Sequence, residues 1–224
     1  MEQIGRVLAN LSRGTGTLQI PIDKEPTREE KREALRKNLG LSSLDNTFEN
    51  FKLVKGTAKA LTSFKALAYG KTHQCMLLCY GGVGNGKTHL CEATAIEMYK
   101  RGLFVRVMTM SRMMMVLKAG MNKKEGPGYD WLLSSYCLAD RLIIDDVGMG
   151  GSGSDWEYGQ LEDIMIVRYR ERLFTIITTN RDITELPERI ISRFRDPDVG
   201  TCVLNQGEDY RRLKDSHGKQ GGNR

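Results

Sequence analysis

The fold is decided by the stretch Gly81-Gly82-Val83-Gly84-Asn85-Gly86-Lys87-Thr88, which matches the phosphate-binding pattern G-x-x-x-x-G-K-[ST] at every fixed position. The apolar run from Cys75 to Tyr80 before it has the length of a buried strand, and His89 to Arg101 has the apolar spacing of a helix. In this context a glycine-rich loop turns its backbone N–H groups inward, and the helix adds its positive N-terminal end. The sequence therefore predicts a loop that holds the phosphates of a nucleoside triphosphate.

Two side chains of this stretch carry further predictions. Lys87 is expected to reach the β- and γ-phosphates, and the hydroxyl of Thr88 is expected to bind Mg²⁺. The alternative is an ordinary glycine turn between a strand and a helix, which the flanking elements and the Lys-Thr pair disfavour.

The composition is that of a globular protein. The chain has 224 residues, enough for one sizeable core with an extension. No stretch reaches the apolar length that a membrane span needs, and the N-terminus lacks the pattern of a secretion signal. We therefore expect one domain with a tail, in the cytoplasm and without membrane contact. The formal net charge of +6 favours contact with a polyanion without proving it.

The two ends of the chain are predicted to lie outside this domain. In Met1 to Ser12, apolar residues recur at the spacing of a short amphipathic helix, whose apolar face needs a partner in this chain or on another protein. Gly14 to Pro26 is expected to be a linker, and Thr27 to Asn38 a charged helix that Gly40 ends. Asp215 to Arg224 is polar and glycine-rich and is expected to be disordered.

Two carboxylates end the apolar run from Arg141 to Asp146, which is the arrangement needed opposite a phosphate loop. Asp145 is expected to hold Mg²⁺, directly or through water, and Asp146 to polarise the attacking water. The alternative is a strand that simply ends in acidic turn residues.

Two later elements also carry polar side chains that can act on the γ-phosphate. The strand predicted at Leu173 to Thr179 ends in Asn180, whose amide can bridge the γ-phosphate and the attacking water. A turn-forming Asn explains this position equally well. Leu186 to Arg195 is predicted to be a helix that starts at Pro187. An exposed arginine there can reach the γ-phosphate of a neighbouring subunit, although most helix arginines only face water.

The remaining segments complete an alternation of strands and helices. Two more strands are predicted, at Leu103 to Met110 and at Thr201 to Leu204. The other predicted helices are Thr57 to Tyr69, Arg112 to Met121 with Ser111 as its cap, and Trp156 to Arg172. Five strands alternating with helices predict an α/β fold with a parallel sheet and with the nucleotide at the carboxyl ends of the strands.

A basic, glycine-containing loop from Asn122 to Gly128 is followed by Tyr129 and Trp131. Base stacking beside lysines suits single-stranded nucleic acid. A solvated loop next to a packed aromatic side chain explains the pattern at least as well. The candidate DNA contacts are Lys118, Lys123, Lys124, Tyr129 and Tyr158.

Five segments occur in a distinctive order. They are Thr47-Phe48-Glu49-Asn50-Phe51, the phosphate loop followed by His89-Leu90, Ile144-Asp145-Asp146-Val147-Gly148, Thr178-Thr179-Asn180, and Leu186-Pro187-Glu188-Arg189-Ile190-Ile191-Ser192-Arg193-Phe194. Together they resemble the DnaC/DnaI family of AAA+ replicative helicase loaders. The resemblance runs from about Asn46 to Leu213, and no single segment would establish it.

The resemblance implies an AAA+ P-loop ATPase domain at residues 46–213, after a helical extension at 1–45 and before a tail at 214–224. It implies an ATPase that opens or holds a hexameric DnaB-type helicase and places it on single-stranded DNA. ATP, with Mg²⁺, acts in this family mainly as a switch. Helicase binding through Met1 to Ser12 is a hypothesis that goes with this function.

The family roles transfer position by position. Gly81 to Thr88, with His89, correspond to the nucleotide-binding residues, and Thr88 and Asp145 to the metal-binding residues. The resemblance further implies that Asn180 is the first sensor, that Arg211 is the second sensor, and that Arg193 is the finger that acts on an adjacent subunit in a self-associated ring. Asp146 stands where AAA+ proteins most often have Glu, so slow hydrolysis that DNA or a partner stimulates is expected.

Three other functions stay open. An IstB-type transposition ATPase shares these motifs but works with a transposase on duplex DNA. A small-molecule P-loop kinase would use the same loop, yet it would need an arginine-bearing lid and an acceptor pocket. The short side chain of Asp146 also fits an ATP-bound adaptor that does not hydrolyse its nucleotide.

Overall fold

Residues 27–123, 125–148 and 154–210 are described by the computed structural model, which contains a five-stranded sheet. The strands are β1 (Met76–Tyr80), β2 (Arg106–Thr109), β3 (Arg141–Asp145), β4 (Phe174–Thr179) and β5 (Gly200–Leu204). Their order in the sheet is β2-β3-β4-β1-β5, and every neighbouring pair is parallel. The predicted α/β class and the five-stranded parallel sheet are confirmed.

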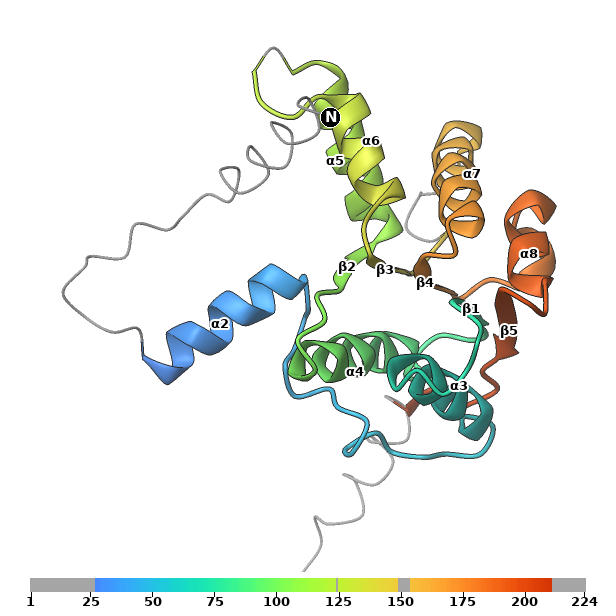
Figure 1. The fold of residues 1–224 in the computed structure, drawn as a ribbon. Coiled ribbons are helices and arrows are strands. Elements are labelled where there is room, and N and C mark those ends of the chain that lie inside the picture. The colour runs from blue at the N-terminus through green and yellow to red at the C-terminus, as the bar shows by residue number, and fades with distance from the viewer. Residues whose placement is uncertain (1–26, 124, 149–153, 211–224) are drawn as a thin grey trace, which may run out of the picture. The chain divides into compact units, whose positions relative to one another are not determined.

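Helices cover both faces of this sheet (Figure 1). The helices of the described residues are α2 (Arg28–Leu39), α3 (Ala58–Ala68), α4 (Lys87–Lys100), α5 (Met110–Met121), α6 (Tyr129–Cys137), α7 (Asp155–Arg170) and α8 (Glu188–Arg195), with a 3₁₀ turn, η1, at Ile183–Glu185. Helices α3 and α4 pack on one face, and α5 to α8 pack on the other. This is the layered arrangement in which a parallel sheet buries both faces.

Strand β1 is apolar throughout because each face of the sheet has its own core. In β1, Met76 and Leu78 belong to the core under α5 to α8, whereas Leu77 and Cys79 belong to the core under α3 and α4. Successive side chains of a strand point to opposite faces, so both sets of positions are buried. This explains why the run before the phosphate loop shows no alternation of apolar and polar residues.

Two details differ from the sequence-based expectation. The predicted cap at Ser111 is wrong, because α5 begins at Met110 and the side chain of Thr109 accepts a hydrogen bond from the backbone N of Arg112 at 3.2 Å. Thr109 has the extended backbone that a capping residue needs. Helix α6 is an addition to the predicted elements, because the sequence pattern there indicates only aromatic residues after a basic loop.

Arg168 of α7 fastens α6 to the sheet although it is fully buried. Its guanidinium donates to the carbonyl oxygens of Tyr136 at 3.0 Å, Ala139 at 2.7 Å and Phe174 at 2.6 Å, and to the hydroxyl of Thr175 at 2.8 Å. Burial lowers the pKa of Arg168 to about 10. Arg168 thereby supplies donors to carbonyls at the end of α6, which have no partner within that helix, and joins them to the start of β4.

The chain divides into two units between Glu33 and Ala34. The unit that begins at Ala34 contains the sheet, and Leu39 and Leu41 are buried in its core. Residues 34–45, which the sequence analysis assigned to the N-terminal extension, therefore cluster with the predicted ATPase domain. The helix predicted at 1–12 and the tail predicted at 214–224 lie outside the described residues. Within the part of the chain that the structure describes, no helix is long and apolar enough to cross a membrane.

Candidate nucleotide-binding site

The phosphate loop lies between β1 and α4, at the carboxyl end of the sheet. The strand order puts β4 beside β1 and β3 beside β4, so the ends of these strands meet next to the loop. A cavity of about 780 Å³ opens there. It is lined by residues 83–89 of the loop and of α4, by Asp145, Asp146, Thr178 and Asn180 from the strand ends, and by Ser42, Asn46, Asn50, Phe51, Lys52, Val54, Thr57, Thr109 and Tyr210.

The loop needs glycine at two positions in particular. Gly86 precedes α4 with a φ of 90°, and a Cβ atom there would lie 2.7 Å from the ring of Phe51. Gly81 has a φ of 136°, and a Cβ atom there would lie 2.2 Å from the carbonyl oxygen of Asn205. Only glycine adopts such a backbone without strain and leaves room for these neighbours.

Lys87 is buried with its ammonium group among uncharged acceptors. The Nζ atom donates to the carbonyl oxygens of Gly81 at 2.7 Å and Gly82 at 2.6 Å, and to Oδ1 of Asn85 at 2.9 Å. Burial lowers the pKa of Lys87. A triphosphate would give this cation a charged partner, which forms stronger hydrogen bonds than neutral acceptors do.

Thr88 and Asp145 fit a Mg²⁺ ion. The Thr88 hydroxyl donates to Oδ2 of Asp145 at 2.7 Å, and the Thr178 hydroxyl donates to Oδ1 of the same carboxylate. Mg²⁺ is commonly bound by oxygen ligands from one or two side chains, with water and substrate phosphates completing its shell. The hydroxyl and the carboxylate therefore match the predicted metal pair in chemistry and in proximity.

Asp146 and Asn180 are brought into direct contact. The Asn180 side-chain amide donates to Oδ1 of Asp146 at 2.6 Å. Asp146 has a φ of 60°, which is uncommon for a residue other than glycine, and its backbone N donates to the Thr178 hydroxyl at 3.1 Å. Burial raises the pKa of Asp146, and the nearby charge of Asp145 adds to this while that of Lys87 opposes it. The arrangement links a candidate base to the end of β4.

Residues 15–206 match the family described as IstB-like ATP binding protein. The chain belongs to this family. Over 158 residues, which are 67% of this chain, it is 32% identical to the chromosomal replication initiator protein DnaA of Bordetella pertussis. The match covers 32% of that DnaA, so this IstB-like chain spans about a third of the length of the curated relatives it matches.

Solved structures share the fold of this IstB-like protein. A DnaC helicase loader has a TM-score of 0.61 and 21% identity, over 72% of this chain and 97% of that chain. A replication initiator DnaA bound to AMPPCP and single-stranded DNA has a TM-score of 0.60 and 22% identity, over 77% of this chain and 55% of that chain. These likenesses establish the AAA+ fold. With the family match, the chain is an IstB-like ATP-binding protein that shares the fold of a DnaC helicase loader and of a DnaA replication initiator.

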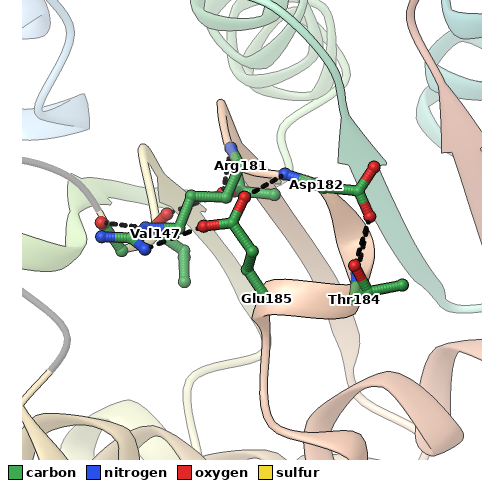
Figure 2. Close-up of polar contacts among 7 residues, drawn as sticks. Val147, Arg181, Asp182, Thr184 and Glu185 are labelled. Carbon is green, nitrogen blue, oxygen red and sulfur yellow. Dashed lines mark hydrogen bonds and ion pairs between the residues drawn. The ribbon is translucent and has the colours of Figure 1, made fainter.

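Arg181, which the sequence analysis did not single out, holds the chain after β3 (Figure 2). Its Nε donates to the carbonyl oxygen of Gly148 at 2.6 Å, and its Nη1 pairs with Glu185 at 3.0 Å. The backbone N of Asp182 also donates to Glu185, at 3.2 Å. The adjacent residues Asn180 and Arg181, which follow β4, thus hydrogen-bond to Asp146 and Gly148 respectively. A basic residue directly after the predicted sensor was the available sequence signal.

A segment at residues 42–51, which we call the strap, forms another wall of the cavity. Inside the strap, the backbone N of Thr47 donates to Oδ1 of Asn50 at 3.0 Å, and the backbone N of Asn50 donates to the Thr47 hydroxyl at 3.4 Å. Glu92 of α4, which the sequence analysis also missed, contacts the strap. The available signal was a charged residue between Cys91 and Ala93, in the middle of a run from Leu90 to Ile96 that is otherwise uncharged.

The chain after β5 is fastened to the phosphate loop. The side-chain amide of Asn85 donates to the carbonyl oxygen of Asn205 at 2.8 Å, and the amide of Asn205 donates back to the carbonyl oxygen of Asn85 at 3.0 Å. The backbone N of Tyr210 donates to the carbonyl oxygen of Gly84 at 3.0 Å. Tyr210, which comes just before the predicted second sensor, therefore lies against the loop and lines the cavity.

The predicted finger residue does not line the cavity of its own chain. Arg193 lies on α8, is half-buried and is absent from the cavity lining, so its action on a neighbouring subunit stays a prediction. Arg211 lies outside the described residues.

The candidate DNA contacts lie mainly around α5, α6 and α7. Lys118 pairs with Glu157 at 2.9 Å and lies over the ring of Trp156, and the Tyr129 hydroxyl donates to Gln160. Of the other candidates, Lys123 is exposed, Tyr158 is half-buried, and Lys124 lies outside the described residues. Their contact with DNA stays a prediction.

Proposed function

We propose that this IstB-like protein loads a hexameric DnaB-type helicase onto single-stranded DNA, with ATP binding and hydrolysis acting as a switch. The observation that carries the switch is the hydrogen bond of 2.6 Å between Asn180 and Asp146. It links the end of β4 to the residue that would activate water, so that loss of the γ-phosphate would change the partners of both side chains. The order of the motifs and the fold shared with the DnaC helicase loader support the choice of partner.

The described residues divide the chemistry of ATP hydrolysis among them. Lys87 would bind the β- and γ-phosphates, and Thr88 and Asp145 would hold Mg²⁺, which neutralises phosphate charge when bound. Asp146 would orient and deprotonate the attacking water, and Asn180 would hold Asp146 in place. Asp146 is one methylene shorter than the Glu that AAA+ proteins most often have there, so slow turnover that DNA or the helicase stimulates is expected.

Self-association would complete the site. Arg193 is on α8 and does not line the cavity of its own chain. In the proposed assembly it would instead reach the γ-phosphate bound by an adjacent subunit, where such an arginine accelerates hydrolysis by about three to five powers of ten. Arg211 would act as the second sensor.

Single-stranded DNA is the proposed nucleic-acid partner. Met115, Met121 and Trp131 of α5 and α6 are exposed, and so is Lys123, which follows α5 in the sequence. Aromatic and basic side chains together bind single strands by stacking and by neutralising phosphates. The DnaA structure with AMPPCP and single-stranded DNA, which shares the fold, supports this assignment.

A second candidate is an IstB-type transposition ATPase that acts with a transposase on duplex DNA. The family match over residues 15–206 favours it. The phosphate loop, Asp145 and Asn180 would serve either function equally, so the partner decides between the two.

Light scattering of this protein mixed with a DnaB-type hexamer separates the two functions. The mixture is measured with an ATP analogue and with ADP, and the Lys87→Ala variant is measured alongside. We expect a complex that depends on the ATP analogue and that the variant does not form. Failure to bind any replicative helicase, together with nucleotide-dependent binding to duplex DNA, would favour the transposition ATPase instead.

A further inference from the structure

A buried carboxylate on α4 holds the strap. Glu92 is only 2% exposed, and its Oε1 accepts hydrogen bonds from the backbone N atoms of Ser42 at 2.5 Å and Ser43 at 3.4 Å. Its Oε2 accepts from the side-chain amide of Asn46 at 2.5 Å. A buried acid is costly unless its oxygens find donors, and here the strap supplies them for both oxygens. Glu92 therefore fixes the first half of the strap.

His89, three residues before Glu92 on the same helix face, fixes the second half. Its Nε2 donates to the carbonyl oxygen of Thr47 at 2.8 Å, since a carbonyl oxygen only accepts. Its ring meets Phe51 edge-on, with 5.2 Å between the ring centroids. Two neighbouring side chains of α4 thus hold the strap against the helix whose first residue is Lys87.

The strap lines the same cavity as the phosphate loop. Lys87 and Thr88 define the phosphate end, and the strap residues Ser42, Asn46, Asn50 and Phe51 line the same cavity. A nucleotide whose phosphates lie on the loop would place its base and ribose against the remaining walls, and the strap is one of them. Glu92 is not among the lining residues, so it acts through Ser42 and Asn46.

We propose that Glu92 is a positioning residue that sets the strap against the nucleoside part of bound ATP. The proposal rests on the proposed function of this site, because it requires ATP in the cavity. A residue that acts in this way contributes to the binding of the base and ribose but not to the binding of the phosphates. A residue that merely supports the fold would affect both parts of the nucleotide alike.

Calorimetry with two ligands separates these roles. The full chain is titrated with ATP and with tripolyphosphate, both in the presence of Mg²⁺, because tripolyphosphate has the phosphates and lacks the base and ribose. In Glu92→Leu, which removes both acceptors, we expect the affinity for ATP to fall about tenfold. The affinity for tripolyphosphate should stay within about twofold of the unchanged protein.

Two further variants control the experiment. Glu92→Gln keeps one acceptor and the size of the side chain, so the loss of ATP affinity should be about threefold, and this variant serves if Glu92→Leu does not fold. Glu97→Gln is the same substitution on the same helix, at a residue that pairs with Lys100 and lies outside the cavity lining. It should change neither affinity.

The outcomes are distinct. Equal losses for ATP and tripolyphosphate, or no loss for either in a folded variant, would overturn the positioning role of Glu92. An unchanged protein that binds tripolyphosphate as tightly as ATP would also overturn it, because the nucleoside would then gain nothing from the strap. An unchanged protein that binds neither ligand would overturn the proposed function itself, which is a different failure.

Discussion

Two walls of the nucleotide cavity are built in different ways. The proposed wall for the phosphates consists of residues 83–88 with Asp145, Asp146 and Asn180, which lie at the ends of strands or at the start of a helix. Its geometry comes from the hydrogen bonds of the sheet and from glycines with left-handed backbone. The strap is an irregular segment that side chains of α4 hold in place. The shape of the proposed wall for the phosphates is therefore set by the fold itself. The position of the strap, the proposed wall for the nucleoside, depends on a few individual side-chain contacts.

The largest effect should come from Lys87→Ala, which breaks the wall for the phosphates. This substitution removes a buried cation that would contact the β- and γ-phosphates, so the affinity for ATP and for tripolyphosphate should both fall by about a hundredfold or more. Calorimetry with the two ligands measures this. Lys100→Ala, at the other end of α4, is the matched control and should change neither affinity, because Lys100 lies outside the cavity lining. A selective loss for ATP alone would contradict the division into two walls.

Much of the wall for the phosphates could be predicted because its residues stand next to one another in the sequence. The loop, the Asp145-Asp146 pair and Asn180 each follow an apolar run, and the carboxyl ends of parallel strands meet at one edge of the sheet. The order of strands and helices in the sequence therefore predicts that these residues lie close together. The confirmed sheet puts β3 beside β4 and β4 beside β1. The contact between Asn180 and Asp146 follows from this order.

The strap could not be predicted in the same way. Glu92 and Ser42 are 50 positions apart, and no periodic pattern links a helix residue to an irregular segment. Helix α6 was missed for another reason. Its apolar residues recur at helical spacing and pack into the core; they are Tyr129, Leu132, Leu133, Tyr136 and Cys137. The basic loop before them favours a different interpretation, in which the aromatic residues contact nucleic acid. The cap of α5 depends on the backbone of Thr109, which the residue type alone does not reveal.

The next largest effect concerns catalysis within the wall for the phosphates. In Asp146→Asn, the side chain can still accept a hydrogen bond from Asn180 but can no longer take a proton from water. Steady-state ATP hydrolysis should therefore fall by about a hundredfold, while the affinity for ATP changes by less than about threefold. If hydrolysis stays unchanged, Asp146 is not the base, and the function as an ATP-bound adaptor without turnover becomes the better explanation of its short side chain.

The pH dependence of hydrolysis provides an independent check on Asp146. Burial raises the pKa of this carboxyl above its usual value of 3.8, with a further rise from the charge of Asp145 and an opposing effect of Lys87. Because a base must be deprotonated, activity is full above the raised pKa and is lost as the pH falls through it. The loss should begin at a higher pH than an unperturbed aspartate would give, and Asp146→Asn should abolish this limb of the pH profile.

A smaller effect is expected from Arg181→Ala. Arg181 holds the carbonyl oxygen of Gly148 and so fixes the segment in which Asp146 has its uncommon backbone conformation. Turnover should fall by about tenfold with ATP affinity unchanged, because a misplaced group costs rate more than binding. Arg181→Lys keeps the charge but lacks the Nε donor, so it should behave like Arg181→Ala. Full activity of the lysine variant would mean that the charge, rather than the bond to Gly148, is what matters.

The smallest effect should come from His89, which lies where the two walls meet. His89 lines the cavity, yet its ring bonds to Thr47 and packs on Phe51, so we expect it to serve the strap rather than the phosphates. His89→Ala should lower the affinity for ATP by about threefold to fivefold, less than Glu92→Leu, because one neutral hydrogen bond and one ring contact are lost. The affinity for tripolyphosphate should not change. His89→Gln, whose amide can still donate to Thr47, should recover part of the loss. If His89→Ala weakens tripolyphosphate as much as ATP, then His89 contacts the phosphates directly, and the boundary between the two walls lies further along α4 than the contacts of the strap indicate.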